Sequence, residues 1–287
     1  MSPTSTTRSD TFDIGGDLTV NRLGFGAMRV TGEDIVGRPP DEEDAKEVLR
    51  RAVELGVDFV DTADSYGPGV SERLIGEALG DPDDAVVASK AGLLRNRDGD
   101  WLPHGDPDFL KNQVLCSLDR LGTETIDLYQ YHRPDPDTDF EASVHAFAEM
   151  RDAGQVAHVG LSNVTVEQLE TAMEIVDIAT VQNRYNVGNR DDEYVLRACE
   201  RHDVGFIPWG PMYAVEEEGV AAVLDEVTGR RGATPRQVAL AWLLEHSDVT
   251  LPIPGTSSVE HLETNVAAAA ARTSAATASR TGSDGSP

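Results

Sequence analysis

The sequence predicts a (β/α)8 TIM barrel preceded by a short β-hairpin. Eight short apolar runs alternate with longer helical patterns along the chain. The apolar runs are nearly continuous rather than alternating, as expected for parallel strands that are covered on both faces. The length of 287 residues suits one such barrel. We therefore expect a single domain over residues 12–271, with residues 1–11 and 272–287 as disordered tails of polar and small residues.

The individual elements follow from local signals. The stretch "TFDIGGDLTVN" predicts a hairpin that turns at Gly15 and Gly16. The barrel strands are expected at residues 23–28, 57–62, 85–89, 126–131, 156–161, 179–182, 204–209 and 249–253. Helices are expected at residues 41–56, 70–80, 107–121, 139–153, 165–176, 191–203, 219–230 and 234–246, with a closing helix from near 258 to 271. A doubly wound sheet is the alternative, but "GFGAMR" lacks the third glycine of its dinucleotide fingerprint.

Composition narrows the class of protein. Lys and Arg total 24 and Asp and Glu total 51, so the net charge is −27, and the acids are spread along the chain. Such a surface is expected to repel nucleic acid and anionic membranes, and it suits either solvation in high salt or general solubility. Neither a membrane span nor an export signal is indicated, so we expect a cytoplasmic protein. Cys116 and Cys199 lack metal-ligand spacing, and we expect neither a disulfide nor a metal site.

Polar residues of a few types follow the predicted strands. Active sites of such barrels lie at the carboxyl ends of the strands, so these positions are the candidate functional residues. Taken singly, Asp61 can serve a turn, and Ser162 and Asn163 can cap the next helix. Their position at matching strand ends favours one shared site. In chain order the candidates are Asp61, Tyr66, Lys90, His132, Ser162, Asn163, Gln182 and Trp209.

The four ionisable candidates suit proton transfer to a carbonyl group. Tyr66 has an ordinary pKa near 10, and a neighbouring ammonium such as Lys90 favours the phenolate and eases proton donation. Asp61 can hold that ammonium in place, and His132 can orient a carbonyl oxygen by a hydrogen bond. Since neither a Ser-His-Asp nucleophile nor a metal-ligand cluster is evident in the sequence, the hydride is expected from a nicotinamide.

Amide and aromatic candidates suit that nicotinamide. A carboxamide presents one acceptor and one donor, which the side chains of Asn163 and Gln182 can satisfy. Trp209 is expected to stack on the ring. The expected partners are thus a nicotinamide cofactor and a small carbonyl compound.

Over roughly residues 12–270 the sequence resembles the aldo-keto reductases. "VDTADSYGPGVSERLIGEAL" and "LCSLDRLGTETIDLYQYHR" are similar to the family's motifs around strands 2 and 4, and "GLSN", "VQNRYN" and "LPIPGTSSVEHLETN" to its cofactor motifs. The resemblance implies NAD(P)H-dependent reduction of an aldehyde or ketone. It implies Tyr66 as the general acid, Lys90 and Asp61 as its activating pair and His132 as the orienting residue, with Ser162, Asn163 and Gln182 at the carboxamide.

The resemblance also implies contacts to the rest of the cofactor. Gly210, Pro211 and Met212 would run beside the pyrophosphate, and Trp209 stands where the family often has a stacking tyrosine. Adenosine and its 2′-phosphate would lie against Gly255, Thr256, Ser257, His261 and Asn265. Gly255 and His261 replace the Lys and Arg of many members, and Thr264 replaces a Glu. NADPH is still expected, with NADH as the alternative, because hydroxyl and N–H groups at a helix start bind phosphate.

The sequence gives less information on the substrate and on the biological role of the protein. Met28, Trp101, His104 and Tyr185 are expected to line the mouth with Trp209, which suits aromatic or heteroaromatic aldehydes. The overall pattern "LGFGAMR…IPWGPM…LPIPGTSSVEHLE" is similar to that of bacterial members described as pyridoxal reductases. Pyridoxal is therefore one candidate substrate, and aliphatic aldehydes, ketones and sugars are the alternatives. A cofactor-sensing regulatory subunit of this fold and a cofactor-free lyase or isomerase are the other functions considered.

Overall fold

A computed structural model of the chain describes residues 11–80, 85–96, 98–231 and 233–268. The first strand, β1 (Thr11–Ile14), begins inside the segment that we predicted to be tail. The remaining tail residues, 1–10 and 272–287, lie outside the described residues, as does the predicted end of the closing helix at residue 271.

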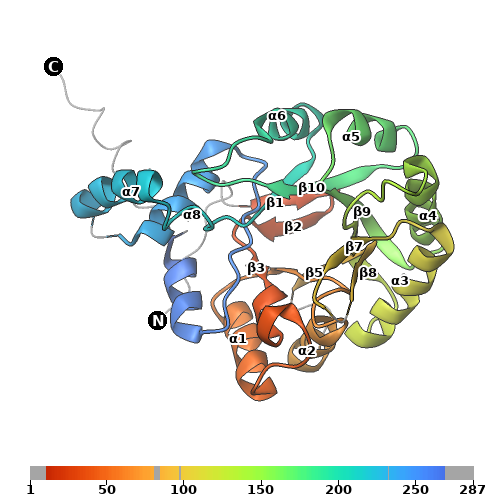
Figure 1. The fold of residues 1–287 in the computed structure, drawn as a ribbon, viewed down its shortest axis with the longest axis horizontal. Coiled ribbons are helices and arrows are strands. Elements are labelled where there is room, and N and C mark those ends of the chain that lie inside the picture. Colours follow the sequence, from red (N-terminus) through yellow and green to blue (C-terminus); the bar gives the residue numbers. More distant parts are fainter. Residues whose placement is uncertain (1–10, 81–84, 97, 232, 269–287) are drawn as a thin grey trace.

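Seven parallel strands form the main sheet, in the same order as in the sequence. Sequential order distinguishes a barrel from the doubly wound alternative, whose strand order reverses at a switch point. Figure 1 shows the helices outside this ring of strands. The strands are β3 (Phe25–Gly26), β4 (Phe59–Asp61), β5 (Val86–Ala91), β8 (Ile126–Tyr131), β9 (Val156–Ser162), β10 (Ile178–Arg184) and β11 (Gly205–Trp209).

The segment 249–254 closes the ring without forming a regular strand. On one side it pairs with β11, where Phe206 N donates to Val249 O over 2.7 Å and Leu251 N donates to Phe206 O over 2.8 Å. On the other side Gly24 N donates to Pro252 O over 3.0 Å, and Gly26 N lies 3.4 Å from Pro254 O. Pro252 and Pro254 have no N–H to donate, so the predicted eighth strand is only an isolated bridge at Thr250. A Cβ on Gly26 would lie 2.7 Å from Ile253 O, so glycine permits this close approach.

The helices begin where the sequence offers a cap. Asp41, Asp106 and Asp139 accept backbone N–H groups at the starts of α1, α3 and α4. Thr165 and Thr234 form capping boxes with the glutamines three residues later, at the starts of α5 and α8. The helices are α1 (Glu42–Glu54), α2 (Val70–Leu79), α3 (Pro107–Leu121), α4 (Phe140–Asp152), α5 (Val166–Met173), α6 (Glu193–His202), α7 (Glu218–Arg231), α8 (Pro235–His246) and a last helix at 259–268; short 3₁₀ turns lie at Ala27–Val30 and Glu33–Ile35.

The predicted hairpin lies across the barrel interior. β1 pairs with β2 (Leu18–Asn21) through a turn at Gly15 and Gly16, both with positive φ. Ile14 and Val20 are fully buried against the inward side chains of the barrel strands, which include Phe59, Leu128 and Ile207. Figure 1 shows the red hairpin in the middle of the ring. The hairpin therefore covers one end of the barrel core and leaves the carboxyl ends of the strands for a site.

A second hairpin was not predicted. β6 (Leu93–Arg95) pairs with β7 (Trp101–Pro103) in the segment that we expected to be a loop after β5. The Arg95 guanidinium carbon lies 3.8 Å from the centre of the Trp101 ring, and Arg95 Nη2 donates to Asp34 O over 2.6 Å. These contacts fix the orientation of Trp101.

Candidate active site

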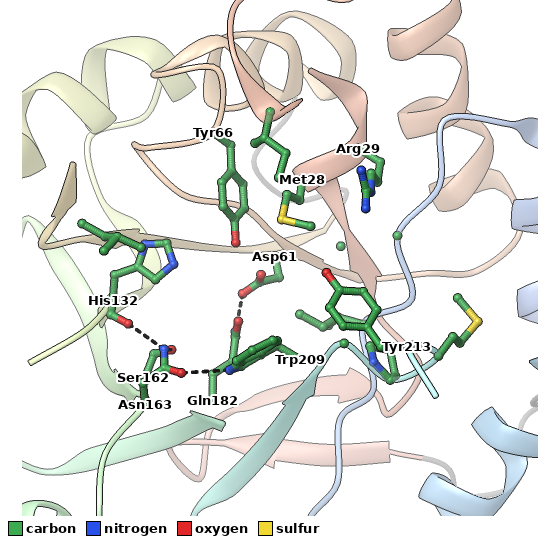
Figure 2. A pocket seen from close by; sticks show the side chains of 18 of the residues that line it. Met28, Arg29, Asp61, Tyr66, His132, Ser162, Asn163, Gln182, Trp209 and Tyr213 are labelled. Carbon is green, nitrogen blue, oxygen red and sulfur yellow. Dashed lines mark hydrogen bonds between the residues drawn. The ribbon is translucent and has the colours of Figure 1, made fainter. Parts of the chain in front are cut away.

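A cavity of about 630 Å³ opens at the carboxyl ends of the barrel strands. Figure 2 shows side chains from opposite sides of the barrel pointing into it. Thirteen of the predicted site residues line it: Met28, Asp61, Tyr66, Trp101, His132, Ser162, Asn163, Gln182, Trp209, Gly210, Pro211, Met212 and Gly255.

Lys90 and Asp61 form a buried ion pair beneath the cavity. Lys90 Nζ lies 2.6 Å from Asp61 Oδ1 and donates to Thr62 O over 2.7 Å, and both charged side chains are at most 2% exposed. Complete burial lowers the pKa of Lys90, and Asp61 opposes that shift. The amides of Gln130 and Gln182 donate to Asp61 Oδ2 over 3.1 and 2.8 Å. The carboxylate is thus held from three other strands.

Tyr66 lies above this pair, and its hydroxyl oxygen is 3.5 Å from Lys90 Nζ. Figure 2 shows the hydroxyl directed into the cavity toward Asp61 and His132. Burial and the negative charge of Asp61 raise the pKa of Tyr66 well above 10. This corrects the expectation that Lys90 lowers that pKa, because burial of the hydroxyl has the largest effect and the charge of Asp61 acts in the same direction. Tyr66 is consequently a protonated acid at neutral pH, with an ammonium beside it to stabilise the phenolate that proton donation leaves.

His132 lies at the edge of the same group. Its ring centre is 5.9 Å from that of Tyr66, and Ser65 Oγ lies 3.4 Å from His132 Nδ1. Burial, followed by the charges of Lys90 and Arg133, lowers the pKa of His132 well below 6.5. A neutral imidazole that accepts from Ser65 at Nδ1 keeps its proton on Nε2, where it can donate to an oxygen in the cavity.

The predicted carboxamide ligands are already hydrogen-bonded to each other and to the scaffold. Asn163 Nδ2 donates to His132 O over 3.1 Å and to Ser162 Oγ over 2.9 Å, and Trp209 Nε1 donates to Asn163 Oδ1 over 3.1 Å. Asn163 has φ of 58°, a left-handed conformation that asparagine tolerates better than most residues. Thr165, rather than Ser162 or Asn163, caps the next helix. The amide of Asn163 therefore faces the cavity with its orientation fixed.

The residues expected at adenosine lie on and before the last helix. Asn265 is 2% exposed, and both its Oδ1 and Nδ2 are buried without a hydrogen-bond partner among the described residues. An adenine offers the donor and acceptor that such an amide can bind at N6 and N7. Thr256 is buried, with its Oγ accepting from Ser258 N, while Ser257 and His261 are exposed. The unsatisfied amide of Asn265 fits an adenine nucleotide.

Two predicted mouth residues lie elsewhere. Tyr185 is fully buried behind the barrel wall, where it stacks on Trp242 and donates a short hydrogen bond to Glu193. His104 packs on Phe109 at a ring distance of 4.5 Å and does not line the cavity. Both predictions were wrong because the spacing of apolar residues predicts strands and helices. It does not predict the direction that a loop takes after its strand.

Other lining residues were missed. They include Arg29, Ile35, Arg133, Tyr213, Glu216 and Arg236. Gln130, which contacts Asp61, could have been found from the sequence: it is on β8 two residues before His132, and residues two apart along a strand point to the same face. No comparable signal identifies Arg236, which comes from the first turn of α8.

The described ranges lack two kinds of feature. Over residues 11–268, apart from the gaps given above, no group of three His, Cys, Asp or Glu side chains is arranged to hold a metal ion. In the same part of the chain, no helix has the length and apolar character needed to cross a membrane.

Comparison with known proteins identifies the family. The model of the Aldo/keto reductase family matches residues 22–281. An uncharacterised oxidoreductase of Schizosaccharomyces pombe is 46% identical over 254 residues, which cover 88% of this chain and 83% of that protein. Pyridoxine 4-dehydrogenase of Escherichia coli is 41% identical over 268 residues, covering 91% and 93%.

Solved structures agree with this assignment. An aldo-keto reductase from Klebsiella pneumoniae, solved in complex with NADPH, superposes with a TM-score of 0.79 at 26% identity, covering 91% of this chain and 89% of that one. The chain therefore belongs to the Aldo/keto reductase family and is an NAD(P)-dependent oxidoreductase.

Proposed function

We propose that the chain reduces an aromatic or heteroaromatic aldehyde with NADPH, and that pyridoxal is the first substrate to test. The observation that carries the proposal is the grouping of Tyr66, His132 and the buried Lys90 and Asp61 pair around one cavity. The E. coli relative is named for the reverse reaction at position 4 of pyridoxine. NADPH is favoured by the Klebsiella complex and by an NADP(+)-dependent relative in S. pombe that is 30% identical.

In this proposal each side chain has one task. His132 Nε2 binds the carbonyl oxygen and directs it toward the Tyr66 hydroxyl. Tyr66 donates its proton to that oxygen as negative charge develops on it. Lys90 then faces the phenolate, and Asp61 keeps Lys90 oriented through their contact of 2.6 Å. The reaction is completed by a hydride that the nicotinamide supplies when it is bound.

Asn163, Ser162 and Gln182 are proposed to hold the carboxamide of the nicotinamide. The bond from Asn163 Nδ2 to His132 O and the bond from Gln182 to Asp61 connect this binding region to the catalytic group.

The walls of the cavity support a flat substrate. Trp101 lies 6.3 Å from Tyr66 and 6.5 Å from His132, ring centre to ring centre. Leu93 and Met28 add apolar surface. Aromatic walls bind planar aromatic rings by stacking and edge contacts.

We also propose a reducing compartment, the cytoplasm, and tolerance of high salt. Cys116 and Cys199 are free thiols, as is usual in reducing compartments. Of the acidic side chains, those of Glu43, Asp108 and Asp177 are largely exposed, at 73%, 96% and 107%. Repulsion among such charges weakens in molar salt, where the Debye length is about 3 Å.

The direct test is the loss of reduced-nicotinamide absorbance with pyridoxal, benzaldehyde and an aliphatic aldehyde, using NADPH and NADH separately at low and molar salt. We expect pyridoxal to have the highest kcat/KM, NADPH to be preferred, and activity to persist in molar salt. Faster turnover of the aliphatic aldehyde than of both ring compounds would contradict the substrate proposal. Activity confined to low salt would contradict the salt proposal.

The raised pKa of Tyr66 predicts opposite pH profiles for the two directions. An acid whose pKa is raised stays protonated to higher pH, so kcat for reduction should be flat from pH 6 to about 9. Oxidation of the alcohol needs the phenolate as base, so its kcat should rise by about tenfold per pH unit over the same range. The measurement is kcat in both directions with saturating cofactor. A reduction rate that falls steeply between pH 7 and 9 would show that the Tyr66 pKa is not raised.

A further inference from the structure

The cavity is lined by three arginines although acidic residues in the chain outnumber basic ones, 51 to 24. These are Arg29, Arg133 and Arg236. Among the described lining residues the acidic groups are Asp61, which is paired with Lys90, and Glu216. The unbalanced positive charge in an acidic protein indicates a cavity that receives an anionic ligand.

The three arginines occupy different parts of the cavity. Arg133 directly follows His132, so it belongs to the end where the carbonyl reacts. Arg29 follows β3, and its Cγ lies 3.9 Å from the point where a Cβ on Gly255 would be. Arg236 is in the first turn of α8.

The first turn of α8 is fixed next to the predicted adenine site. Gln237 Nε2 donates to Thr264 O over 3.0 Å, which joins α8 to the last helix beside Asn265. Asn265 is the buried residue whose amide lacks partners on both polar atoms. Arg236 lines the cavity and precedes Gln237 on α8, so we assign it to the adenosine end.

Among the described residues, the two positions where many family members carry Lys and Arg supply no cation to the cavity. Gly255 has no side chain, and His261 is exposed and does not line the cavity. Arg236 is held only loosely by the described residues, since its Nη2 lies 3.9 Å from Glu216 Oε1 and the two side chains are 43% and 87% exposed. Exposed pairs of this kind contribute little, so Arg236 can exchange Glu216 for a phosphate.

We propose that Arg236 binds the 2′-phosphate of NADPH and sets the preference for NADPH over NADH. The N-terminal position on a helix of 12 residues adds a favourable dipole for a phosphate dianion. The site for the 2′-phosphate is thereby formed by α8 rather than by the positions of Gly255 and His261. This inference rests on the nicotinamide cofactor of the proposed function, and it is independent of which carbonyl compound is reduced.

The test is cofactor binding without any carbonyl substrate, measured as quenching of the protein's tryptophan fluorescence. Loss of a charge-assisted contact predicts that Arg236→Ala raises the Kd of NADPH by about ten- to a hundredfold. The Kd of NADH should change less than about twofold, because NADH has no 2′-phosphate. Adenosine 2′,5′-bisphosphate should compete better than 5′-AMP against the wild-type protein, and Arg236→Ala should remove that difference.

Two further variants distinguish a specific contact between Arg236 and the 2′-phosphate from a general effect of the protein's net charge. Arg201→Ala removes the same charge from an exposed position on α6 and should change neither Kd. Glu216→Gln removes the competing carboxylate and should tighten NADPH binding but not NADH binding. Equal weakening of both cofactors by Arg236→Ala, or an unchanged NADPH Kd, would overturn the proposal. Failure to reduce pyridoxal with normal NADPH binding would count against the substrate and leave this inference standing.

Discussion

Tyr66→Phe is expected to lower kcat for aldehyde reduction by about 10³- to 10⁴-fold while the Kd of NADPH stays within about twofold of wild type. The variant removes one oxygen, which is the only hydroxyl that lies within reach of both Lys90 and the reacting region among the described residues that line the cavity near His132. Packing should be kept, since the ring contacts with Trp101 and His132 do not need that oxygen. The measurement is single-turnover reduction with saturating NADPH, so that product release does not hide the chemical step.

Tyr213→Phe is the matched control for this variant. Tyr213 also lines the cavity, but it is 50% exposed and packs against Trp209 rather than against the ion pair. It should retain most of kcat. If Tyr66→Phe kept more than about a tenth of the wild-type rate, Tyr66 would not be the proton donor. The residual rate of Tyr66→Phe should also lose the pH dependence of alcohol oxidation.

The fold could be predicted where local chemistry decides the structure. Asp41, Asp106 and Asp139 mark helix starts because a side-chain oxygen must satisfy the first free N–H groups, and α3 begins at the predicted residue. The prediction of a regular strand at residues 249–253 was wrong because this apolar segment contains Pro252 and is followed by Pro254. Pro252 and Pro254 accept hydrogen bonds from Gly24 and Gly26 but cannot donate any, so the barrel closes without an eighth ladder.

The residues of the site could be predicted where they follow directly from the ends of the strands. Side chains at strand ends converge because parallel strands bring their carboxyl ends to one rim, and this placed Tyr66, His132 and Gln182 correctly in the cavity. Sequence could not show that Gln182 also donates to Asp61, since that contact crosses the barrel interior. The positions of Tyr185 and Arg236 depend on where loops and helix ends lie in space. The periodicity of the sequence does not predict those positions.

Lys90→Met is expected to abolish measurable reduction and to lower the free energy of unfolding by about 3 to 5 kcal/mol. The substitution leaves the Asp61 carboxylate buried without a counter-charge, retaining only the amide donors Gln130 and Gln182. A buried unpaired carboxylate is stabilised by taking up a proton, so the folded variant binds more protons than its unfolded state. Its stability should therefore fall as pH rises from 5 to 8, a slope that the wild-type pair should not show.

A double-mutant cycle separates the structural part of this effect from the catalytic part. Asp61→Asn combined with Lys90→Met removes both charges and keeps an oxygen for the amide donors, so it should regain most of the lost stability in urea unfolding. It should not regain kcat, because no ammonium is left to stabilise the Tyr66 phenolate. Lys111→Met, which breaks an exposed pair with Glu149, should change stability by less than about 0.5 kcal/mol. If Lys90→Met were as stable as wild type at pH 8, the buried pair would contribute no net charge interaction to the fold, and its role in positioning Tyr66 would need another explanation.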